Sequence, residues 1–212
     1  MSDLTTAAAE WIAGDPDPIT RAELQGIVES GDVDELTERM GATLQFGTAG
    51  LRGRVEAGSN RMNRATVIRA TKGLADYLVA TTGTAAGPVV VGRDARLSSA
   101  TFMDDTIGVL VSAGFQVRYF AEPTPTPLVA YAALNLDAVA AVVITASHNP
   151  PADNGYKVYA QNGAQIIPPT DSDIAAAIAA VGPASDVPRA EIVGAAAQPI
   201  GEDLFSDYLF DV

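Results

Sequence analysis

The sequence predicts an α/β fold in which helices and strands alternate along the chain. Apolar runs of strand length recur at Pro88–Gly92, Phe115–Phe120 and Ala138–Ile144, and segments with helical periodicity lie between them. Hydrophobic residues make up 48% of the 212 residues, enough to build a substantial core. This alternation is typical of a layered α/β domain, in which the ends of the strands meet at a common edge.

The chain opens with a stretch, Leu4–Met40, that is expected to be helical and peripheral. An Asp-Pro-Asp-Pro string at Asp15–Pro18 separates two of its helices, and Thr20 with Glu23 fits a capping box at the start of the second. A glycine-rich segment, Phe46–Arg54, follows.

Asn63 is expected to begin a long helix, whose apolar face is made by Val67, Ile68, Thr71, Leu74, Ala75, Leu78 and Val79. Ser98 or Ser99 should cap the next helix, whose inward side chains are Phe102, Met103, Ile107, Leu110 and Val111. A proline-rich stretch then breaks the chain before a short helix over 128–134, and Tyr156–Tyr159 is a further expected strand.

The last part of the chain contains a change of composition. The region Val181–Ile200 is rich in Gly, Pro and Ala and is predicted to be a linker. Glu202–Val212 then forms an amphipathic helix, with apolar Leu204, Phe205, Tyr208, Leu209 and Phe210. Either this helix belongs to a partner domain, or it folds back on the core of the first domain.

Composition excludes several classes of function. With 26 acidic and 13 basic residues the formal charge is −13, which disfavours nucleic acid and anionic membranes as partners. The lack of cysteine excludes a thiol nucleophile, disulfides and a thiolate zinc site, and a single histidine, His148, excludes a multi-histidine metal site. A metal here would be bound by oxygen, which favours Mg²⁺. No signal peptide and no apolar run of membrane-spanning length is visible, so we expect a cytoplasmic protein.

The string Thr145–Pro150 follows directly after the buried strand at Ala138–Ile144. Ser147 therefore lies at the carboxyl end of a strand, where α/β proteins usually bind ligands. The neighbouring His148 raises the possibility of a serine hydrolase, but adjacent side chains on an extended segment point apart, and the G-x-S-x-G elbow is absent. A simple polar turn through Ser147 and Asn149 is the other alternative.

Three further segments carry groups that suit an anion. The glycine-rich segment offers backbone N–H groups beside Arg52, although it lacks the Gly-Lys-Ser/Thr ending of a P-loop and also fits an ordinary glycine loop. Lys157 follows an Asn-Gly turn and either neutralises charge or moves a proton, unless it is a solvated lysine at a strand edge. At Arg93–Arg96, a local Asp–Arg pair is expected to orient the loop.

Taken together, these motifs resemble the α-D-phosphohexomutase superfamily, which includes phosphoglucomutases and phosphomannomutases. The string Phe46–Gly53 is similar to the N-terminal motif of that family, Thr145–Pro150 to its phosphoserine loop, and Asn154–Lys157 to its lysine motif. The opening Trp11–Leu24 is similar to the branch that also contains phosphopentomutases.

The resemblance implies a three-layer α/β/α sandwich with a mixed sheet. Residues 1–190 would form the first domain, with the phosphoserine loop, and 191–212 would be a linker and the first helix of a second domain. The implied activity is phosphoryl transfer between the 1- and 6-positions of glucose or mannose phosphate, with a hexose 1,6-bisphosphate as activator. A phosphopentomutase and a non-catalytic module that binds phosphosugars are the alternatives.

The resemblance also assigns roles to individual residues. Ser147 would carry the phosphoryl group and ligate Mg²⁺, whose other ligands would come from a second-domain loop that this sequence lacks. Arg52 and Lys157 would handle protons and stabilise charge, His148 would support the serine site, and substrate phosphate would be bound by Thr48, Gly50, Arg52 and Asn149. The chain alone is therefore expected to be incomplete as an enzyme and to self-associate through its exposed terminal helix.

Overall fold

The computed structural model describes residues 3–85, 87–192 and 194–211. Within these ranges the chain forms a mixed six-stranded sheet in the order β1-β5-β4-β2-β3-β6. The pairs β2–β4, β2–β3 and β3–β6 are parallel, whereas β5 runs antiparallel to both β4 and β1. The bounds are β1 Leu51–Arg54, β2 Pro88–Arg93, β3 Gln116–Tyr119, β4 Ala140–Ile144, β5 Asp153–Ala160 and β6 Ala197–Pro199.

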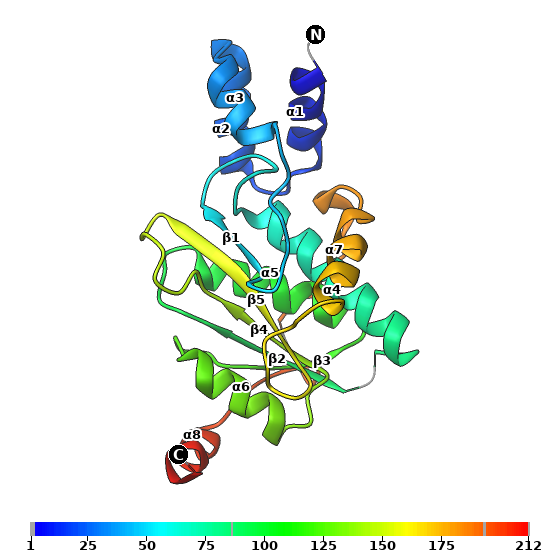
Figure 1. The fold of residues 1–212 in the computed structure, drawn as a ribbon, viewed down its shortest axis with the longest axis vertical. Helices are drawn as coiled ribbons and strands as arrows, with labels where there is room; N and C mark the ends of the chain where they lie inside the picture. Colours follow the sequence, from blue (N-terminus) through cyan, green and yellow to red (C-terminus); the bar gives the residue numbers. More distant parts are fainter. Residues whose placement is uncertain (1–2, 86, 193, 212) are drawn as a thin grey trace.

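Helices cover both faces of the sheet (Figure 1). One face carries α4 and α5, with α7 packed beside α4, and the other carries α6 and α8. Their bounds are α4 Arg64–Thr82, α5 Ser99–Ser112, α6 Thr126–Asn135, α7 Thr170–Ala179 and α8 Glu202–Asp211. No helix in the described ranges is long and apolar enough to cross a lipid bilayer.

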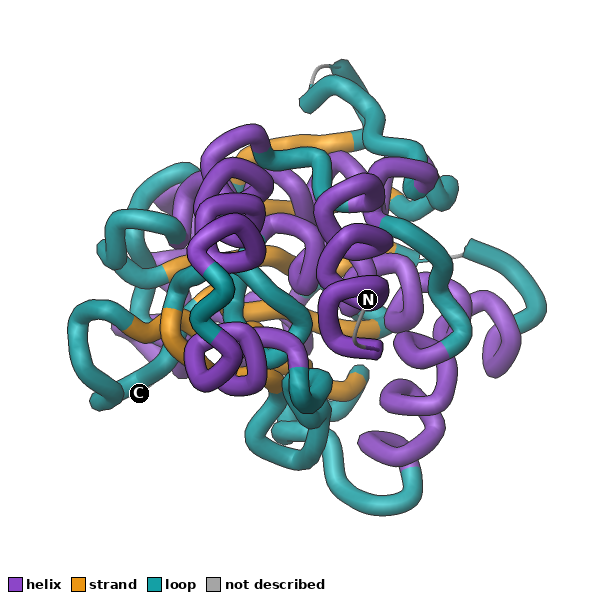
Figure 2. The backbone as a smooth tube through the Cα atoms, turned by 90° about the horizontal axis from the view of Figure 1, so that it is seen from above, coloured by secondary structure: helices purple, strands orange, loops and turns teal. Residues whose placement is uncertain are grey.

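The alternation of side chains along β2 connects the two cores. Val89 and Val91 belong to the apolar cluster under α4 and α5, whereas Val90 belongs to the cluster under α6. Successive residues of a strand point to opposite faces, so a strand that is apolar throughout is buried between two helical layers. Figure 2, seen from above, shows the strands among the helices. The predicted three-layer α/β/α sandwich with a mixed sheet is confirmed.

The three N-terminal helices pack together beyond one end of the sheet (Figure 1). They are α1 Asp3–Gly14, α2 Pro18–Ser30 and α3 Val33–Met40. Their small core contains Ala8, Leu24, Leu36 and Ala57. The predicted helical and peripheral character of this stretch is confirmed.

The predicted capping box at Thr20 is wrong. Helix α2 begins at Pro18, and the Asp17 carboxylate caps it by accepting a hydrogen bond from the Ile19 N–H at 2.9 Å. Proline suits this first position because its missing N–H would have had no partner there. Thr20 lies inside the helix instead, where its hydroxyl donates to Asp15 at 2.6 Å.

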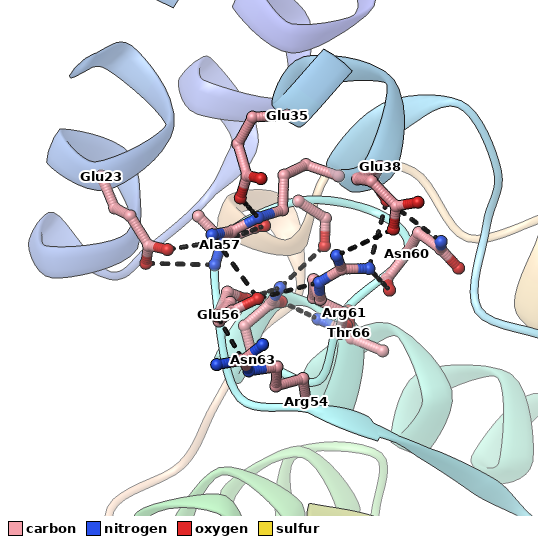
Figure 3. A network of polar contacts seen from close by, with 12 residues as sticks. Glu23, Glu35, Glu38, Arg54, Glu56, Ala57, Asn60, Arg61, Asn63 and Thr66 are labelled. Carbon is pink, nitrogen blue, oxygen red and sulfur yellow. Dashed lines mark hydrogen bonds and ion pairs between the residues drawn. The ribbon is translucent and has the colours of Figure 1, made fainter. Parts of the chain in front are cut away.

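Arg39 joins the N-terminal helices to the loop between β1 and α4, in a polar network to which Glu23, Glu35 and Ala57 also belong (Figure 3). Its guanidinium donates to Glu23 at 2.6 Å, to Glu35 at 2.7 Å and to the Ala57 carbonyl at 3.2 Å. Glu56 lies 3.5 Å away, and the second oxygen of Glu23 accepts from the Ala57 N–H. Because Arg39 is only 6% exposed, these acceptors are what makes its buried charge tolerable.

The long helices mostly follow their predicted faces. Asn63 caps α4 by accepting from the Thr66 N–H at 2.9 Å, as expected. Val79, predicted to lie on the apolar face of α4, is 36% exposed because it lies near the free end of that helix. Ser98 precedes α5 but its hydroxyl does not cap it, because that oxygen accepts from Asn154 instead.

Two strands lie where none was predicted. Leu51–Arg54 of the glycine-rich segment forms β1, and Ala197–Pro199 of the expected linker forms β6. The same stretch also contains a 3₁₀ turn at Ala184–Asp186. Both strands lie at the edges of the sheet and join it through backbone hydrogen bonds. Their amino-acid composition therefore gave little indication of strand structure. Val193 and Val212, within the expected linker and terminal helix, lie outside the described residues.

Helix α8 folds back on α6 along one face only. Leu204 and Tyr208 pack against the cluster under α6, and the Tyr208 ring lies edge-on to Tyr131 at 5.3 Å. The Tyr131 hydroxyl donates to Asp211 at 2.6 Å. The opposite side leaves apolar residues in contact with solvent, namely Phe205, Leu209 and Phe210. The alternative in which this helix folds back on the core is therefore correct for one side of α8. Self-association through the exposed side stays a prediction.

The contact between α4 and α7 requires Gly73. A Cβ at this position would lie 2.6 Å from the backbone of Ile178, whereas a Cβ at Gly26 in α2 would meet nothing within 4 Å. We expect Gly73→Ala to destabilise the fold by about 1–3 kcal/mol through overpacking. Gly26→Ala should stabilise it by about 0.5–1 kcal/mol through helix propensity. Urea unfolding of both variants tests this, and the same sign of change in both would contradict the packing.

Candidate active site

The loop after β4 presents Ser147 to solvent. It begins where the Thr145 N–H donates to the Gly155 carbonyl at 3.1 Å, continuing the β4–β5 pairing beyond the strand. Ser147 then adopts a left-handed backbone conformation with φ 57°, and its own N–H donates to Thr145 Oγ1 at 2.9 Å. Ser147 and His148 are exposed and Asn149 is half-buried. A left-handed serine is uncommon and persists only where its surroundings enforce it.

Arg96, from the loop after β2, enforces this conformation. Its Nη1 donates to the carbonyls of Pro150 at 2.6 Å and Asp153 at 2.9 Å. Its Nη2 donates to the carbonyls of Ser147 at 3.1 Å and Asn149 at 2.9 Å. One planar guanidinium thus fixes the whole backbone of the serine loop.

Asp94 orients Arg96 in turn. Its carboxylate accepts from Arg96 Nε and from the Arg96 N–H, both at 3.0 Å, and from the Ser99 hydroxyl at 2.6 Å. Burial alone would raise the pKa of Asp94, but hydrogen bonds from Ser99, Arg96 and Thr145 together lower that pKa below its ordinary value. The carboxylate therefore stays ionised, and the prediction that a local Asp–Arg pair orients the loop is confirmed.

Asn154 and Gly155, predicted to form a turn, lie inside β5. Asn154 is buried, and its amide donates to Ser98 Oγ at 2.7 Å and Ser99 Oγ at 3.0 Å. A Cβ on Gly155 would lie 2.6 Å from the Thr145 carbonyl oxygen, so the serine loop approaches β5 too closely for any other residue. The Asn-Gly pair therefore supports the loop from below, and the turn prediction is wrong.

Arg52 and Lys157 lie on the same face of the sheet. Arg52 pairs with Gly155 across β1 and β5, and Lys157 follows on the same side of β5. Val143, which pairs with Lys157 across β4, belongs to the cluster under α6. Both cationic side chains are therefore carried on the α6 side of the sheet, toward its β1 edge.

The two cations are partly withdrawn from water. Lys157 is 8% exposed, so the reading as a solvated edge lysine is wrong. Burial lowers the pKa of Lys157, and the positive charge of Arg52 lowers that pKa further. Arg52 Nε is buried without a hydrogen-bond partner in the described part of the chain. Two cations placed close enough to affect each other form a site that an anion would stabilise.

The glycine-rich turn completes this side of the site. Gly50 has φ 73°, its N–H donates to the Gly47 carbonyl at 2.7 Å, and a Cβ there would lie 2.0 Å from the Tyr156 carbonyl oxygen. The Thr48 carbonyl accepts from Gln165 Nε2 at 2.6 Å. An open hollow of about 290 Å³ is lined by Thr48, Ala49, Arg52, Gln165, Ile166 and Ile167. Gly50 shapes this turn, and its predicted role in binding phosphate stays a prediction.

The structure places the predicted site residues in two groups, at the two strands that flank β5. Ser147, His148 and Asn149 follow β4, whereas Thr48, Gly50 and Arg52 belong to β1 or the turn before it. Lys157 lies on β5, between these two strands. Sequence reasoning missed Gln165, for which no motif gave a signal, and the contact of Arg96 with four carbonyls.

The geometry around Ser147 does not suit hydrolase chemistry. The loop is not extended as the sequence reasoning assumed, because Ser147 is left-handed. Even so, among the described residues no hydrogen bond joins the side chains of Ser147 and His148. The nearby carboxylates also have other partners, since Asp94 bonds to Arg96 and Asp153 bonds to Asn149. A serine–histidine–carboxylate relay is therefore not formed by these side chains.

Comparison with known proteins gives a consistent result. The profile of "Phosphoglucomutase/phosphomannomutase, alpha/beta/alpha domain I" matches residues 43–184. The chain is 43% identical to the phosphoribomutase of Saccharomyces cerevisiae, over 84% of this chain and 29% of that protein. It is 40% identical to the phosphopentomutase of Mus musculus over 82% of this chain, and 40% identical to the mouse glucose 1,6-bisphosphate synthase over 81%, in each case matching 29% of the relative.

A solved structure supports the same family relationship. A Thermus thermophilus protein described as a phosphomannomutase superposes with a TM-score of 0.62 at 30% identity, over 76% of this chain and 34% of that one. The chain thus spans about a third or less of the length of these relatives. With the profile match covering strands β1 to β5 and the serine loop, the chain belongs to the phosphoglucomutase/phosphomannomutase family, in its first α/β/α domain.

Proposed function

We propose that this chain supplies the phosphoserine half of a sugar-phosphate mutase, with Ser147 as the residue that carries the phosphoryl group. The observation that carries the proposal is the exposed, left-handed Ser147 whose backbone is fixed by Arg96. A hydroxyl that donates and accepts phosphoryl groups must be accessible yet positioned, because phosphoryl transfer depends mainly on alignment and charge stabilisation.

The proposed transfer begins with a phosphoryl group on Ser147 Oγ. A hydroxyl of the sugar monophosphate forms a new bond to phosphorus, the bond between phosphorus and Ser147 Oγ breaks, and a sugar bisphosphate results. The sugar hydroxyl gives up its proton, and Ser147 Oγ leaves as an alkoxide that takes one up. Transfer of the other phosphate back to Ser147 releases the isomeric monophosphate.

Lys157 and Arg52 suit different parts of this reaction. The lowered pKa of Lys157 brings it closer to a range in which an amine exchanges protons, so Lys157 is proposed to move a proton at the reacting oxygen. Arg52 keeps its charge in proteins and is proposed to hold phosphate oxygens next to the hollow at Thr48. His148 and Asn149 would flank the phosphoserine, His148 as its support and Asn149 at the bound phosphate.

A Mg²⁺ site is not completed by the described residues. No group of three or more acidic or histidine side chains is close enough to hold a metal within the described ranges. The carboxylates beside the serine loop, Asp94 and Asp153, are occupied by Arg96 and Asn149. Ser147 alone does not fit an ion that requires near-octahedral oxygen ligands, so no step here passes through a metal.

The substrate is proposed to be a pentose phosphate, in preference to the glucose or mannose phosphates that the family resemblance implied. The names of the yeast and mouse relatives, phosphoribomutase and phosphopentomutase, support this choice. The similarity to glucose 1,6-bisphosphate synthase keeps hexose phosphates as the alternative.

The first prediction concerns Ser147. The whole reading frame that contains this chain is incubated with ribose 1,5-bisphosphate or with glucose 1,6-bisphosphate, and phosphate is mapped by mass spectrometry. Phosphate should appear on Ser147, should be absent from Ser147→Ala and should be unchanged in the control Ser112→Ala. Phosphate on another residue would refute the assignment, and sugar-phosphate binding without any phosphoserine would show a binding module instead.

The second prediction concerns the two cations. Arg52→Ala and Lys157→Ala should each lower kcat by roughly 10²-fold or more, the scale of lost electrostatic or acid–base help. Matched controls are Arg54→Ala and Lys72→Ala, whose side chains pair with Glu56 and Asp76 and should leave kcat nearly unchanged. Steady-state kinetics decides the matter, since a change confined to KM would assign both residues to substrate binding alone.

The third prediction concerns Arg96 as a positioning residue. Arg96→Lys keeps the charge beside Asp94 but loses the planar fork that reaches four carbonyls. The rate of Ser147 phosphorylation should fall roughly tenfold or more with little change in KM, because all three guanidinium nitrogens of Arg96 already bond to Asp94 or to the loop carbonyls. Arg118→Lys, on β3 beside Gln198, is the control. A wild-type rate in Arg96→Lys would show that the loop holds its shape unaided.

A further inference from the structure

A second set of cationic and donor groups lines two adjoining cavities away from the serine loop. The cavities, of about 410 and 270 Å³, lie where α1, α4 and the segment after α7 meet. Both are lined by Trp11, Thr43, Ser59 and Arg69. None of their lining residues belongs to the serine loop or to the hollow at Thr48 and Arg52.

Arg69 lines both cavities and is the cation that they share. One nitrogen, Nη2, donates to the Val181 carbonyl at 3.0 Å, and the guanidinium carbon lies 5.8 Å from the centre of the Trp11 ring. Its Nε is buried without a hydrogen-bond partner among the described residues. Burial lowers the pKa of Arg69, and no carboxylate contributes to that pKa. A guanidinium cannot discard its proton, so this charge remains without a carboxylate partner among the described residues.

Trp11 supplies a second donor without an acceptor. Its Nε1 is buried and has no partner within the described ranges. Buried donors are nearly always satisfied in native proteins, so two unsatisfied donors on residues that line the same cavities indicate a missing acceptor. Trp11 belongs to α1 and Arg69 to α4, and the contact of the guanidinium with the indole ring brings these two side chains together.

The residues that line the two cavities indicate which class of anion would accept hydrogen bonds from Arg69. The smaller cavity is lined by apolar side chains, including Leu44, Phe46, Leu51 and Ile178, and Arg69 is the one charged residue among the described residues that line it. The larger cavity adds Glu10 at an exposed position. A carboxylate and a phosphate can each accept two parallel hydrogen bonds from a guanidinium, but a phosphate dianion would place two negative charges against one cation, whereas a carboxylate carries one.

From these groups we infer that the cavities bind a small amphipathic organic acid, with its carboxylate on Arg69 and its apolar body against Phe46, Leu51 and Ile178. The site is separate from the proposed phosphoserine chemistry and does not depend on it. Its walls come from α1 and α4, so occupancy would link the N-terminal helices to the sheet domain.

Trp11 allows a direct test, because it is the only tryptophan in the 212 residues. The 212-residue chain is titrated with cyclohexanecarboxylate, which does not absorb in the tryptophan range, and intrinsic fluorescence is recorded. The uncharged cyclohexanecarboxamide and inorganic phosphate are titrated in parallel. We expect a saturable change with the carboxylate, and little or none with the carboxamide or with phosphate.

Variants complete the test. Arg69→Gln keeps an N–H group for the Val181 carbonyl but removes the charge, and it should weaken binding roughly tenfold or more. Arg21→Gln, an exposed arginine on α2, and Ser147→Ala should bind like the wild type. Equal binding of the carboxamide, equal binding by Arg69→Gln, or no saturable change would each overturn the inference, and a response to phosphate alone would refute the carboxylate class.

Discussion

The contact between the Arg96 guanidinium and four backbone carbonyls is the interaction on which the rest of the site depends. Left-handed backbone at a serine costs about 1–2 kcal/mol, and an isolated loop would relax away from it. Arg96 removes that freedom because its donors reach the carbonyl of the strained residue itself and three carbonyls that follow it in the loop. The contact joins the ends of two neighbouring parallel strands, since Arg96 lies in the loop after β2 and the serine loop follows β4. The topology of two adjacent strands therefore determines the conformation of one catalytic candidate.

The parts of the fold that could be predicted are those in which side chains follow a period. The buried strand before Thr145, the cap of α4, the apolar faces of α4 and α5, and the position of Ser147 at a strand end all followed from the sequence. The strands at the sheet edges did not, because Leu51–Arg54 and Ala197–Pro199 join the sheet through backbone hydrogen bonds that leave little trace in composition. The Asn154–Gly155 pair was misassigned because a turn and a crowded strand both favour glycine, and only the three-dimensional contacts distinguish them.

The N-terminal helices are connected to the candidate site through the loop after β1, which Arg39 binds. Arg39 binds acceptors on α2, α3 and the loop after β1, and Arg61 binds Glu38 and Glu56 in the same network (Figure 3). That loop continues directly from β1, the strand that carries Arg52. Removing this network would therefore loosen one end of β1, even though none of its members lies beside Ser147. Sequence periodicity gave no indication of it, since its members are spread over separate segments of the chain.

The distribution of ion pairs separates structural cations from those available to a ligand. Within the described residues, Arg39, Arg61, Arg64 and Arg96 are paired with carboxylates, although the chain carries a formal charge of −13. Arg52, Lys157 and Arg69 are at least half withdrawn from solvent, yet the acidic surplus does not neutralise them. A buried cation without a carboxylate is costly unless an external anion compensates it. In an acidic protein such residues are not explained by the net field, so we propose that their local environments are the places where anions bind: phosphate at Arg52 and Lys157, and a carboxylate at Arg69.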